Sequence, residues 1–312
     1  MSDAFGVPKP PVPPAPGPRL IHDGLAVYAR GTGEPLFLMP YPHGFTSGPI
    51  TEGSLATLLK GLGHCVVSFD PPGAHASTRP PRVDMPEMLS CATEALDALH
   101  IQGPVDTVGH SMGGLCALAL AINRPERVRR LVLVGSGSGG PSLRRHRAMP
   151  WNWSLVSLDF WRYAFWGTCL LWRGGTLAAH KHVERLVRAA SYVDTSRVPA
   201  ISIAAADRHR PAPVRDRWPR TALRLDYGPQ LGEVRAPTLV CAGRYDPQFP
   251  LGCGWELARG IPGARMVVFE RSGHYPHEEE PVTFAQVMAE FLHAQADPVP
   301  AAALPRSRPR GG

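Results

Sequence analysis

The sequence predicts an α/β fold, in which helices cover both faces of a mostly parallel central sheet. Two observations support this prediction. The chain of 312 residues is 44% hydrophobic and holds seven Trp, a composition that excludes a wholly disordered protein. Short apolar runs also alternate along most of the chain with longer segments of helical periodicity, as they do in βαβ units.

The strands and helices can be predicted in order along the chain. Strands are expected at the short apolar runs, which are residues 36–39, 65–69, 105–108, 131–134, 238–241 and 266–269. Helices are expected where the apolar residues recur with helical spacing, at residues 51–61, 85–99, 112–123, 251–260 and 281–294. Because helices separate most of these strands, the strands are predicted to run parallel.

The alternation stops between residues 141 and 234, and this segment is predicted to be a mostly helical lid inserted between two strands. It holds six of the seven Trp. The core is then expected to comprise residues 19–140 and 235–296. Residues 1–18 and 297–312 are rich in Pro and lack helical or strand periodicity, so both are predicted to be disordered tails.

The positive charge of the chain is concentrated in one segment. The net charge is +7, and residues 141–220 contain 14 Arg or Lys against five Asp or Glu. These basic residues are dispersed among Trp and Leu, so no nucleic-acid partner is expected. Two other roles remain for these basic residues: they form a solvated helical surface, or they bind a small-molecule substrate that carries a carboxylate.

The cysteines and the apolar runs restrict the location of the protein. The six Cys show neither a CxxC pair nor His partners at metal-ligand spacing, so no metal site is expected, and the thiols are predicted to be reduced. No apolar run is long enough to span a membrane, and the N-terminus lacks the pattern of a secretory signal. We therefore expect a cytoplasmic protein; the oligomeric state is left open.

A nucleophile is predicted at Ser111. Residues 109–114 read Gly-His-Ser-Met-Gly-Gly and lie between a predicted strand and a predicted helix. In this G-x-S-x-G context a sharp turn projects the serine hydroxyl from the sheet, and the flanking glycines relieve contacts with the crossing backbone. The next N–H, on Met112, begins the helix and is expected to face a developing oxyanion.

An acid and a base follow Ser111 in the order that this motif requires. Asp246 lies in the loop after the strand at 238–241, and His274 lies in the loop after the strand at 266–269. Parallel strands bring the loops at their carboxyl ends to one edge of the sheet. Ser111, His274 and Asp246 are therefore predicted to form a catalytic triad, in which Asp194 and Asp226 are alternative acids.

Two further histidines lie close to these motifs in the sequence. His110 precedes the nucleophile and is expected to have a packing role. His277 follows the base by three residues and stands among Glu278–Glu280, so it is predicted to be a surface residue paired with one of these acids.

Together these motifs resemble the α/β-hydrolase superfamily, and within it the capped branch of proline iminopeptidases and related serine esterases. The resemblance covers about residues 20–140 and 230–294. It includes the sequence 109–114, Pro-Glu-Arg-Val at 125–128, and the loops around Asp246 and His274. It implies an α/β-hydrolase fold in which residues 141–234 form a cap over the active site.

Two loops depart from the pattern of this branch. Residues 39–45 read Met-Pro-Tyr-Pro-His-Gly-Phe, and counting from the strand end puts Pro42, which has no N–H, at the second oxyanion donor. Anchoring on His43 gives the N–H of Phe45 instead, with Tyr41 as the alternative. Residues 70–77 lack the Arg and one Gly of the usual D-x-R-G-x-G-x-S sequence.

The resemblance implies acyl transfer through an acyl-enzyme, with no cofactor. We expect a serine esterase-like hydrolase that cleaves a carboxylic ester, thioester or lactone with an apolar or aromatic acyl part. Tyr41, His43, Trp161 and Trp166 are the candidate substrate-binding residues. The alternatives are a proline-iminopeptidase-like aminopeptidase, which the scarcity of acids in the inserted segment disfavours, and a non-hydrolytic lyase, cyclase or binding protein.

Overall fold

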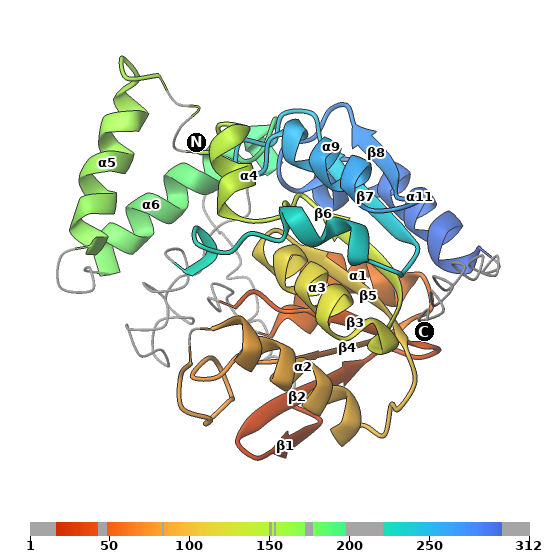
Figure 1. Cartoon of the computed structure of the whole chain (residues 1–312). Coiled ribbons are helices and arrows are strands. Elements are labelled where there is room, and N and C mark those ends of the chain that lie inside the picture. The colour runs from red at the N-terminus through yellow and green to blue at the C-terminus, as the bar shows by residue number, and fades with distance from the viewer. Residues whose placement is uncertain are drawn as a thin grey trace, which may run out of the picture.

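The centre of the molecule is a single sheet of eight strands. The computed structural model describes residues 17–42, 49–82, 84–149, 152, 154–171, 177–197 and 221–294. The strand order is β1-β2-β4-β3-β5-β6-β7-β8, with helices on both faces (Figure 1). This arrangement confirms the predicted fold class. Apart from residues 17 and 18, both predicted tails lie outside the described residues.

Six of the eight strands are parallel and two are antiparallel. The strands are β1 (Leu20–His22), β2 (Leu25–Arg30), β3 (Pro35–Met39), β4 (Cys65–Phe69), β5 (Val105–His110), β6 (Val128–Val134), β7 (Thr238–Gly243) and β8 (Arg265–Phe269). Strands β3 to β8 pair in parallel, and each contains one of the six predicted runs. The antiparallel hairpin of β1 and β2 was not predicted, although Asp23-Gly24 in its turn is a recognised hairpin signal.

The helices divide between the two faces of the sheet. They are α1 (Ser54–Gly61), α2 (Met85–Ala98), α3 (Met112–Asn123), α4 (Gly140–Arg145), α5 (Leu158–Leu171), α6 (Leu177–Ala190), α9 (Leu251–Gly260), α10 (Pro276–Glu279) and α11 (Pro281–His293). Side chains alternate across a strand. Accordingly, Phe37 and Met39 of β3 belong to the core beneath α2, α3 and α9, whereas Leu36 and Leu38 belong to the core beneath α1 and α11.

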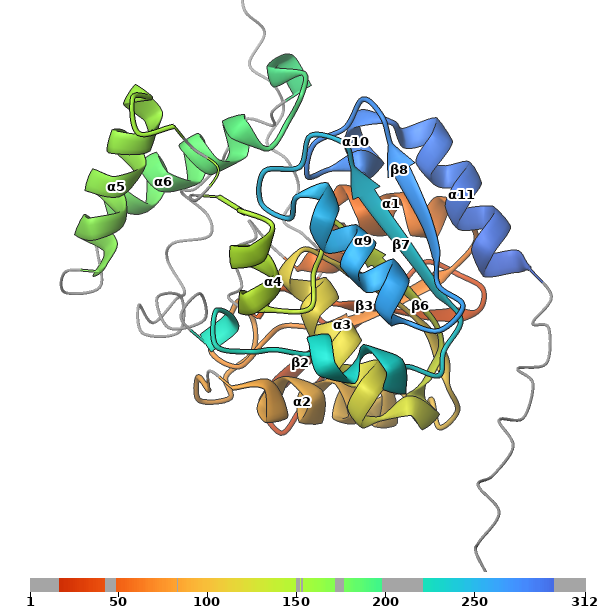
Figure 2. The same ribbon diagram turned by 45° about the horizontal axis from the view of Figure 1, so that its top comes forward.

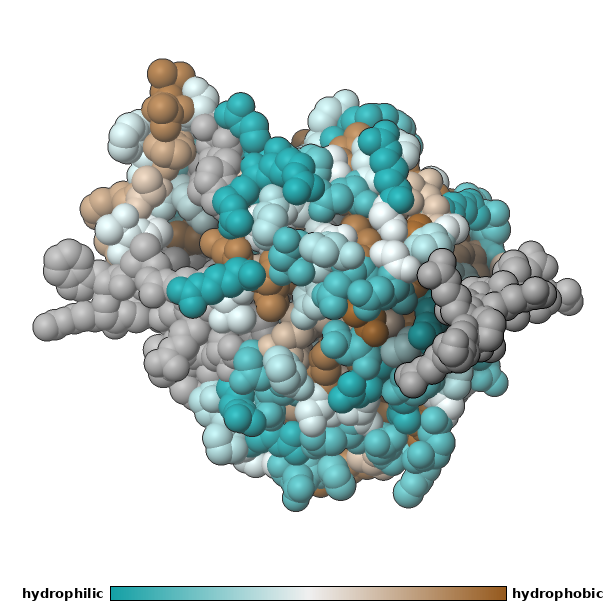
Figure 3. Space-filling view, in the orientation of Figure 1, coloured by the Kyte–Doolittle hydropathy of each residue, from teal (hydrophilic) through white to brown (hydrophobic). Residues whose placement is uncertain are grey.

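The residues between β6 and β7 form an insert, a name that we use for residues 141–234. Within its described residues, α5 packs against α6, and this pair extends away from the sheet (Figures 1 and 2). Several large apolar side chains are exposed on or just before α5; they are Leu155, Val156, Leu158, Trp161 and Phe165 (Figure 3). Among the described helices, none is both long and apolar enough to cross a membrane.

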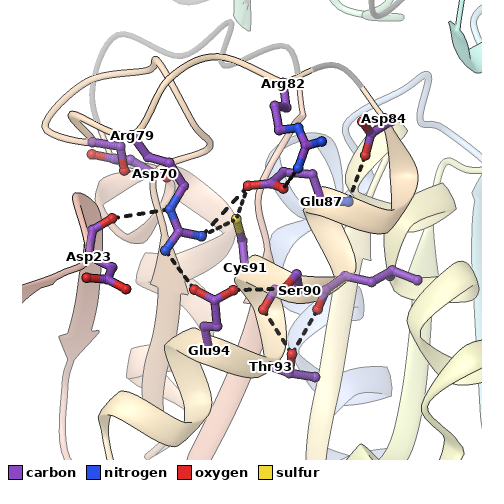
Figure 4. A network of polar contacts seen from close by, with 12 residues as sticks. Asp23, Asp70, Arg79, Arg82, Asp84, Glu87, Ser90, Cys91, Thr93 and Glu94 are labelled. Carbon is purple, nitrogen blue, oxygen red and sulfur yellow. Dashed lines mark hydrogen bonds and ion pairs between the residues drawn. The ribbon is translucent and has the colours of Figure 1, made fainter.

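The loop at residues 70–77, whose sequence differs from the family pattern, is held by hydrogen bonds to its own residues and to β2. The Asp70 carboxylate accepts the Tyr28 hydroxyl at 2.7 Å and the Ala76 N–H at 3.0 Å. The Ser77 hydroxyl donates to the Asp70 carbonyl at 2.6 Å. Arg79, just beyond the loop, pairs with Glu94 of α2 at 2.7 Å, within the polar network of Figure 4. These contacts attach the loop to β2 and α2 without the missing Arg.

Candidate active site

Ser111 occupies a strained turn between β5 and α3. Its φ of 55° and ψ of −126° lie in a region that non-glycine residues rarely adopt. A Cβ atom at Gly109 would lie 2.5 Å from the Gly113 carbonyl, and one at Gly113 would lie 2.7 Å from the Met39 carbonyl. A Cβ atom at Gly114 would lie 2.5 Å from Ser136. The turn therefore requires glycine at all three positions, which explains the sequence around Ser111.

Asp246 and His274 form a buried hydrogen-bonded pair. The His274 Nδ1 and the Asp246 Oδ2 are 2.8 Å apart, and the two residues are 1% and 4% exposed. The other oxygen, Asp246 Oδ1, accepts the N–H groups of Gln248 at 2.8 Å and Phe249 at 2.9 Å. Because the loop holds Oδ1, Oδ2 is fixed toward the imidazole. A carboxylate in this position favours the tautomer with Nδ1 protonated and Nε2 available as a base.

The strained turn at Ser111, called the elbow below, is connected to the loop of His274 through His110. The His110 Nε2 lies 2.8 Å from the His274 carbonyl oxygen, and the centroids of the two imidazole rings are 4.6 Å apart. Within the described residues, no hydrogen bond joins the Ser111 hydroxyl to the His274 imidazole. Catalytic hydrogen bonds are often long before substrate binds, so this geometry is compatible with a nucleophile and its base.

His110 also holds the segment that follows β3. Burial lowers the pKa of His110 well below its usual range, and the nearby His274 and His277 lower it further. The ring is therefore neutral: Nε2–H donates to the His274 carbonyl, and Nδ1 accepts the Tyr41 hydroxyl at 2.5 Å. Burial raises the pKa of Tyr41, which keeps its hydroxyl protonated as the donor. Tyr41 is thus tied to the elbow.

The prediction of His277 as a surface residue is wrong. His277 is 6% exposed and its ring lies 5.2 Å from that of His110 and 5.8 Å from that of Phe284. Burial lowers its pKa to about 4. The predicted pairing with one of the acids is confirmed, because the His277 Nε2 lies 3.8 Å from the Glu278 Oε1. An acidic neighbour in the sequence therefore did not mean that the ring is exposed.

Only part of the predicted oxyanion hole lies in the described residues. Met112 is the first residue of α3, so its N–H has no partner within the helix. The close approach of Gly113 to the Met39 carbonyl brings the start of α3 against the end of β3. Phe45 and His43, the other predicted residues of this region, lie outside the described residues.

The two tryptophans predicted to bind substrate lie on α5. Trp161 is 59% exposed, and its indole N–H donates to the Leu155 carbonyl at 2.7 Å. Trp166 stacks on His182 of α6, with ring centroids 4.3 Å apart. Among the residues that the structure describes, both rings contact other residues of the insert, and neither is brought to Ser111.

The described residues contain no group of three or more His, Cys, Asp or Glu that could hold a metal ion.

Sequence reasoning did not assign functions to several residues that contact the acid and base loops, namely Ser191, Gln248 and Glu279. Glu279 follows the base by five residues and belongs to the part of the chain that resembles the α/β-hydrolase superfamily, so the sequence did offer a signal for it. For Ser191 the sequence offers no such signal, because its contacts arise only from folding.

Comparison with known proteins identifies similar chains. The model of the alpha/beta hydrolase fold matches residues 41–281. A 2-hydroxy-6-oxononadienedioate/2-hydroxy-6-oxononatrienedioate hydrolase of Cupriavidus pinatubonensis is 32% identical over 203 residues, which cover 63% of this chain and 64% of that protein. A relative with the same description from Dechloromonas aromatica is 29% identical over 248 residues, covering 75% of this chain and 78% of that protein. These relatives are not named as proline iminopeptidases.

Solved structures show the same fold. An alpha/beta fold family hydrolase from Bacillus anthracis superposes with a TM-score of 0.68 at 20% identity, covering 84% of this chain and 93% of that chain. A meta-cleavage product hydrolase from Pseudomonas fluorescens superposes with a TM-score of 0.60 at 22% identity, covering 86% and 93%. In sequence, by contrast, the match spans only 64% of the length of the Cupriavidus relative.

Proposed function

The chain belongs to the α/β-hydrolase fold family, and we propose that it is a serine hydrolase with Ser111 as nucleophile, His274 as base and Asp246 as the acid that orients the base. One observation carries this proposal. A buried imidazole and carboxylate from two different loops are 2.8 Å apart, and His110 joins the loop of the imidazole to the strained turn of Ser111. Backbone strain such as that of Ser111, with φ of 55° and ψ of −126°, is found preferentially at functional sites.

The proposed reaction has two halves. In the first, Nε2 of His274 takes the hydroxyl proton as Ser111 Oγ attacks a carbonyl carbon, and Asp246 stabilises the imidazolium. The N–H of Met112, with a second donor from Phe45 or Tyr41, stabilises the oxyanion. The imidazolium then protonates the leaving group. In the second half, His274 activates a water molecule that hydrolyses the acyl-enzyme and restores Ser111.

The relatives support a particular class of substrate. The compounds in their names carry two carboxylates, an enol and a ketone but no ester, so their hydrolysis breaks a carbon–carbon bond beside the ketone. We propose a substrate of this 2-hydroxy-6-oxo-dienoate class for this chain.

The ester, thioester or lactone predicted from the sequence is the second candidate. It would follow the same steps, with an oxygen or sulfur leaving group in place of carbon. The described triad and elbow favour neither leaving group, so the choice between these substrates rests on the relatives.

A substrate panel tests both candidates. Wild type and Ser111→Ala would be assayed against a 2-hydroxy-6-oxo-dienedioate, a short aryl ester, a lactone and a proline arylamide. We expect Ser111-dependent loss of the dienedioate absorbance at a higher kcat/KM than for the other compounds. Faster turnover of an ester or lactone would support the second candidate, and turnover of the arylamide alone would overturn both.

A further inference from the structure

The C-terminal end of α6 contacts the loops of both Asp246 and His274. The Ser191 carbonyl accepts the backbone N–H of His274 at 2.7 Å. The Ser191 hydroxyl oxygen accepts the side-chain amide of Gln248 at 2.8 Å. Gln248 in turn donates its backbone N–H to Asp246. Ser191 is completely buried. One residue of the insert is therefore hydrogen-bonded to the base and to the neighbour of its acid.

Glu279 joins the same two parts of the molecule from the other side. Its Oε2 accepts the N–H of Gly273, the residue before the base, at 2.6 Å. Its Oε1 accepts the N–H of Val193, in the insert, at 2.7 Å. The side chain is 9% exposed. Each carboxylate oxygen thus serves a different segment, and Glu279 bridges the insert and the base loop.

These two segments are also closely packed against each other. A Cβ atom at Gly273 would lie 2.2 Å from the Ser191 carbonyl oxygen. The rings of Tyr192 and Tyr275 stack, with centroids 4.7 Å apart and an interplanar angle of 21°. Residues 191–194 therefore lie directly behind the backbone that carries the catalytic imidazole.

We propose that residues 191–194 and Glu279 form a latch through which the insert positions His274. The inference rests on the proposed function, because it assigns Ser191 and Glu279 as positioning residues for the base of that reaction. The N–H groups of Gly273 and His274 are donated to Glu279 and to Ser191. A displacement of α6 must break these bonds or move the base, so the position of the insert sets the geometry of proton transfer.

Glu280 provides a matched control within the same turn. Its Oε2 alone accepts both the N–H of Arg271 at 2.9 Å and the hydroxyl of Ser272 at 2.6 Å. An amide oxygen could accept both of these bonds, so Glu280→Gln can retain them. Glu279→Gln cannot do the same, because its amide nitrogen would face an N–H donor at Gly273 or at Val193. The two substitutions make the same chemical change but have different consequences for the latch.

The test compares Glu279→Gln, Ser191→Ala and Glu280→Gln with wild type. For Glu279→Gln we expect kcat to fall about tenfold or more with KM little changed, since small misplacements of catalytic groups reduce the rate steeply. Labelling of Ser111 by a fluorophosphonate should slow in parallel. The NMR resonance of the imidazole proton that His274 shares with Asp246 should shift or broaden. Glu280→Gln should match wild type in all three measurements.

The double variant of Ser191→Ala and Glu279→Gln provides a second test, in which the losses of kcat are compared with those of the two single variants. Ser191→Ala removes the bond from the Gln248 amide and the bond that the hydroxyl donates to the Val187 carbonyl of α6, but it keeps the backbone bond to His274. The variant should therefore fold and lower kcat less than Glu279→Gln. If the two residues act as one latch, the fold-decrease in kcat of the double variant should be smaller than the product of the fold-decreases of the single variants. The melting temperature of each variant would be measured to choose an assay temperature at which all are folded.

The inference and the proposed function fail in different ways. If wild type is labelled at Ser111 and Glu279→Gln matches it in labelling, kcat and the imidazole resonance, the latch is overturned and the hydrolase stands. Equal losses in Glu279→Gln and Glu280→Gln would also overturn the latch, because loop stability alone would explain them. If wild type is neither labelled nor active on any substrate of the panel, the proposed function fails and the inference with it.

Discussion

The backbone at Ser111 stores strain that only the surrounding packing can maintain. Such conformations cost about 1–3 kcal/mol each and persist where neighbouring structure imposes them. Here the Ser111 N–H donates to the Val134 carbonyl at 2.9 Å, and the Ser136 hydroxyl donates to the Ser111 carbonyl at 2.9 Å. Both bonds come from β6 and the residues just after it. The neighbouring strand therefore holds the turn that presents the hydroxyl.

The first prediction concerns Asp246. In Asp246→Asn, the carbonyl oxygen is expected to keep the bonds from Gln248 and Phe249, so the amide NH₂ faces His274. That donor favours the tautomer in which Nδ1 is the acceptor, and Nε2 then carries the proton and cannot act as base. We expect kcat to fall roughly 10⁴-fold at pH 7 with the fold retained.

Steady-state kinetics and circular dichroism check this outcome. A folded Asp246→Asn variant with activity within a factor of ten of wild type would remove Asp246 from the proposed mechanism. One of the other acids in the sequence, Asp194 or Asp226, would then be the candidate.

At the residue scale, the sequence was most informative where a reactive residue type directly follows a predicted strand. Ser111, Asp246 and His274 each follow a strand in a recognisable pattern, so the sequence predicted their meeting at one edge of the sheet. The contacts of Ser191 with the loop of His274 could not be predicted, because the two residues lie far apart in the chain. His277 was assigned to the surface from its acidic neighbours, but the turn of α10 directs it into the core.

At the element scale, the loop after β4 depends on one partly buried arginine. The Arg79 side chain is 15% exposed and pairs with Glu94 at 2.7 Å, whereas Arg82 is 66% exposed and pairs with Glu87 at 3.0 Å (Figure 4). Removal of a partly buried hydrogen-bonded charge costs more than removal of an exposed one. We therefore expect Arg79→Met to lower the free energy of unfolding by about 1–3 kcal/mol.

Arg82→Met is the matched control, with an expected loss of less than about 1 kcal/mol. Chemical denaturation of both variants measures the difference. Equal losses would show that Arg79 does not fix the loop to α2, and the missing Arg of the family sequence would then lack a replacement.

The parallel strands were the most predictable elements and the edge hairpin the least. Buried parallel strands are continuous apolar runs, and β3, β4, β6, β7 and β8 each contain one, whereas β5 carries Asp106 and Thr107 between its two valines. Strand β1 is only three residues long with two of them exposed, so no apolar run marks it. The turn between β1 and β2 at Asp23-Gly24, with φ of 48° and 74°, carried the stronger signal.

At the scale of the whole molecule, the fold keeps several histidines buried and neutral. Burial lowers the pKa values of His64 and His110, and that of His277 to about 4. The unfolded chain binds protons at these sites near the usual pKa of about 6.5. Stability is therefore full above about pH 6.5 and is lost as the pH falls toward 4, because the unfolded state then binds more protons.

We expect the melting temperature to fall steeply between pH 7 and pH 4.5, with His277 alone contributing about 2–3 kcal/mol to the loss of stability. His64→Leu should reduce the slope, because burial is the main cause that lowers the pKa of His64. His293, Asp106 and Arg129 also influence the pKa of His64 and are unchanged in this variant. The exposed His22 provides the control, and His22→Gln should leave the slope unchanged. A melting temperature that does not change with pH would contradict the claim that these histidines are buried in their neutral form.

The central claim is that Ser111 is a nucleophile activated by His274. The most direct measurement is mass spectrometry of the folded protein after reaction with a fluorophosphonate, with peptide mapping of the modified residue. We expect one adduct per chain on Ser111, absent in Ser111→Ala and strongly slowed in His274→Ala. A folded protein that stays unmodified, or that carries its adduct on another residue, would contradict it.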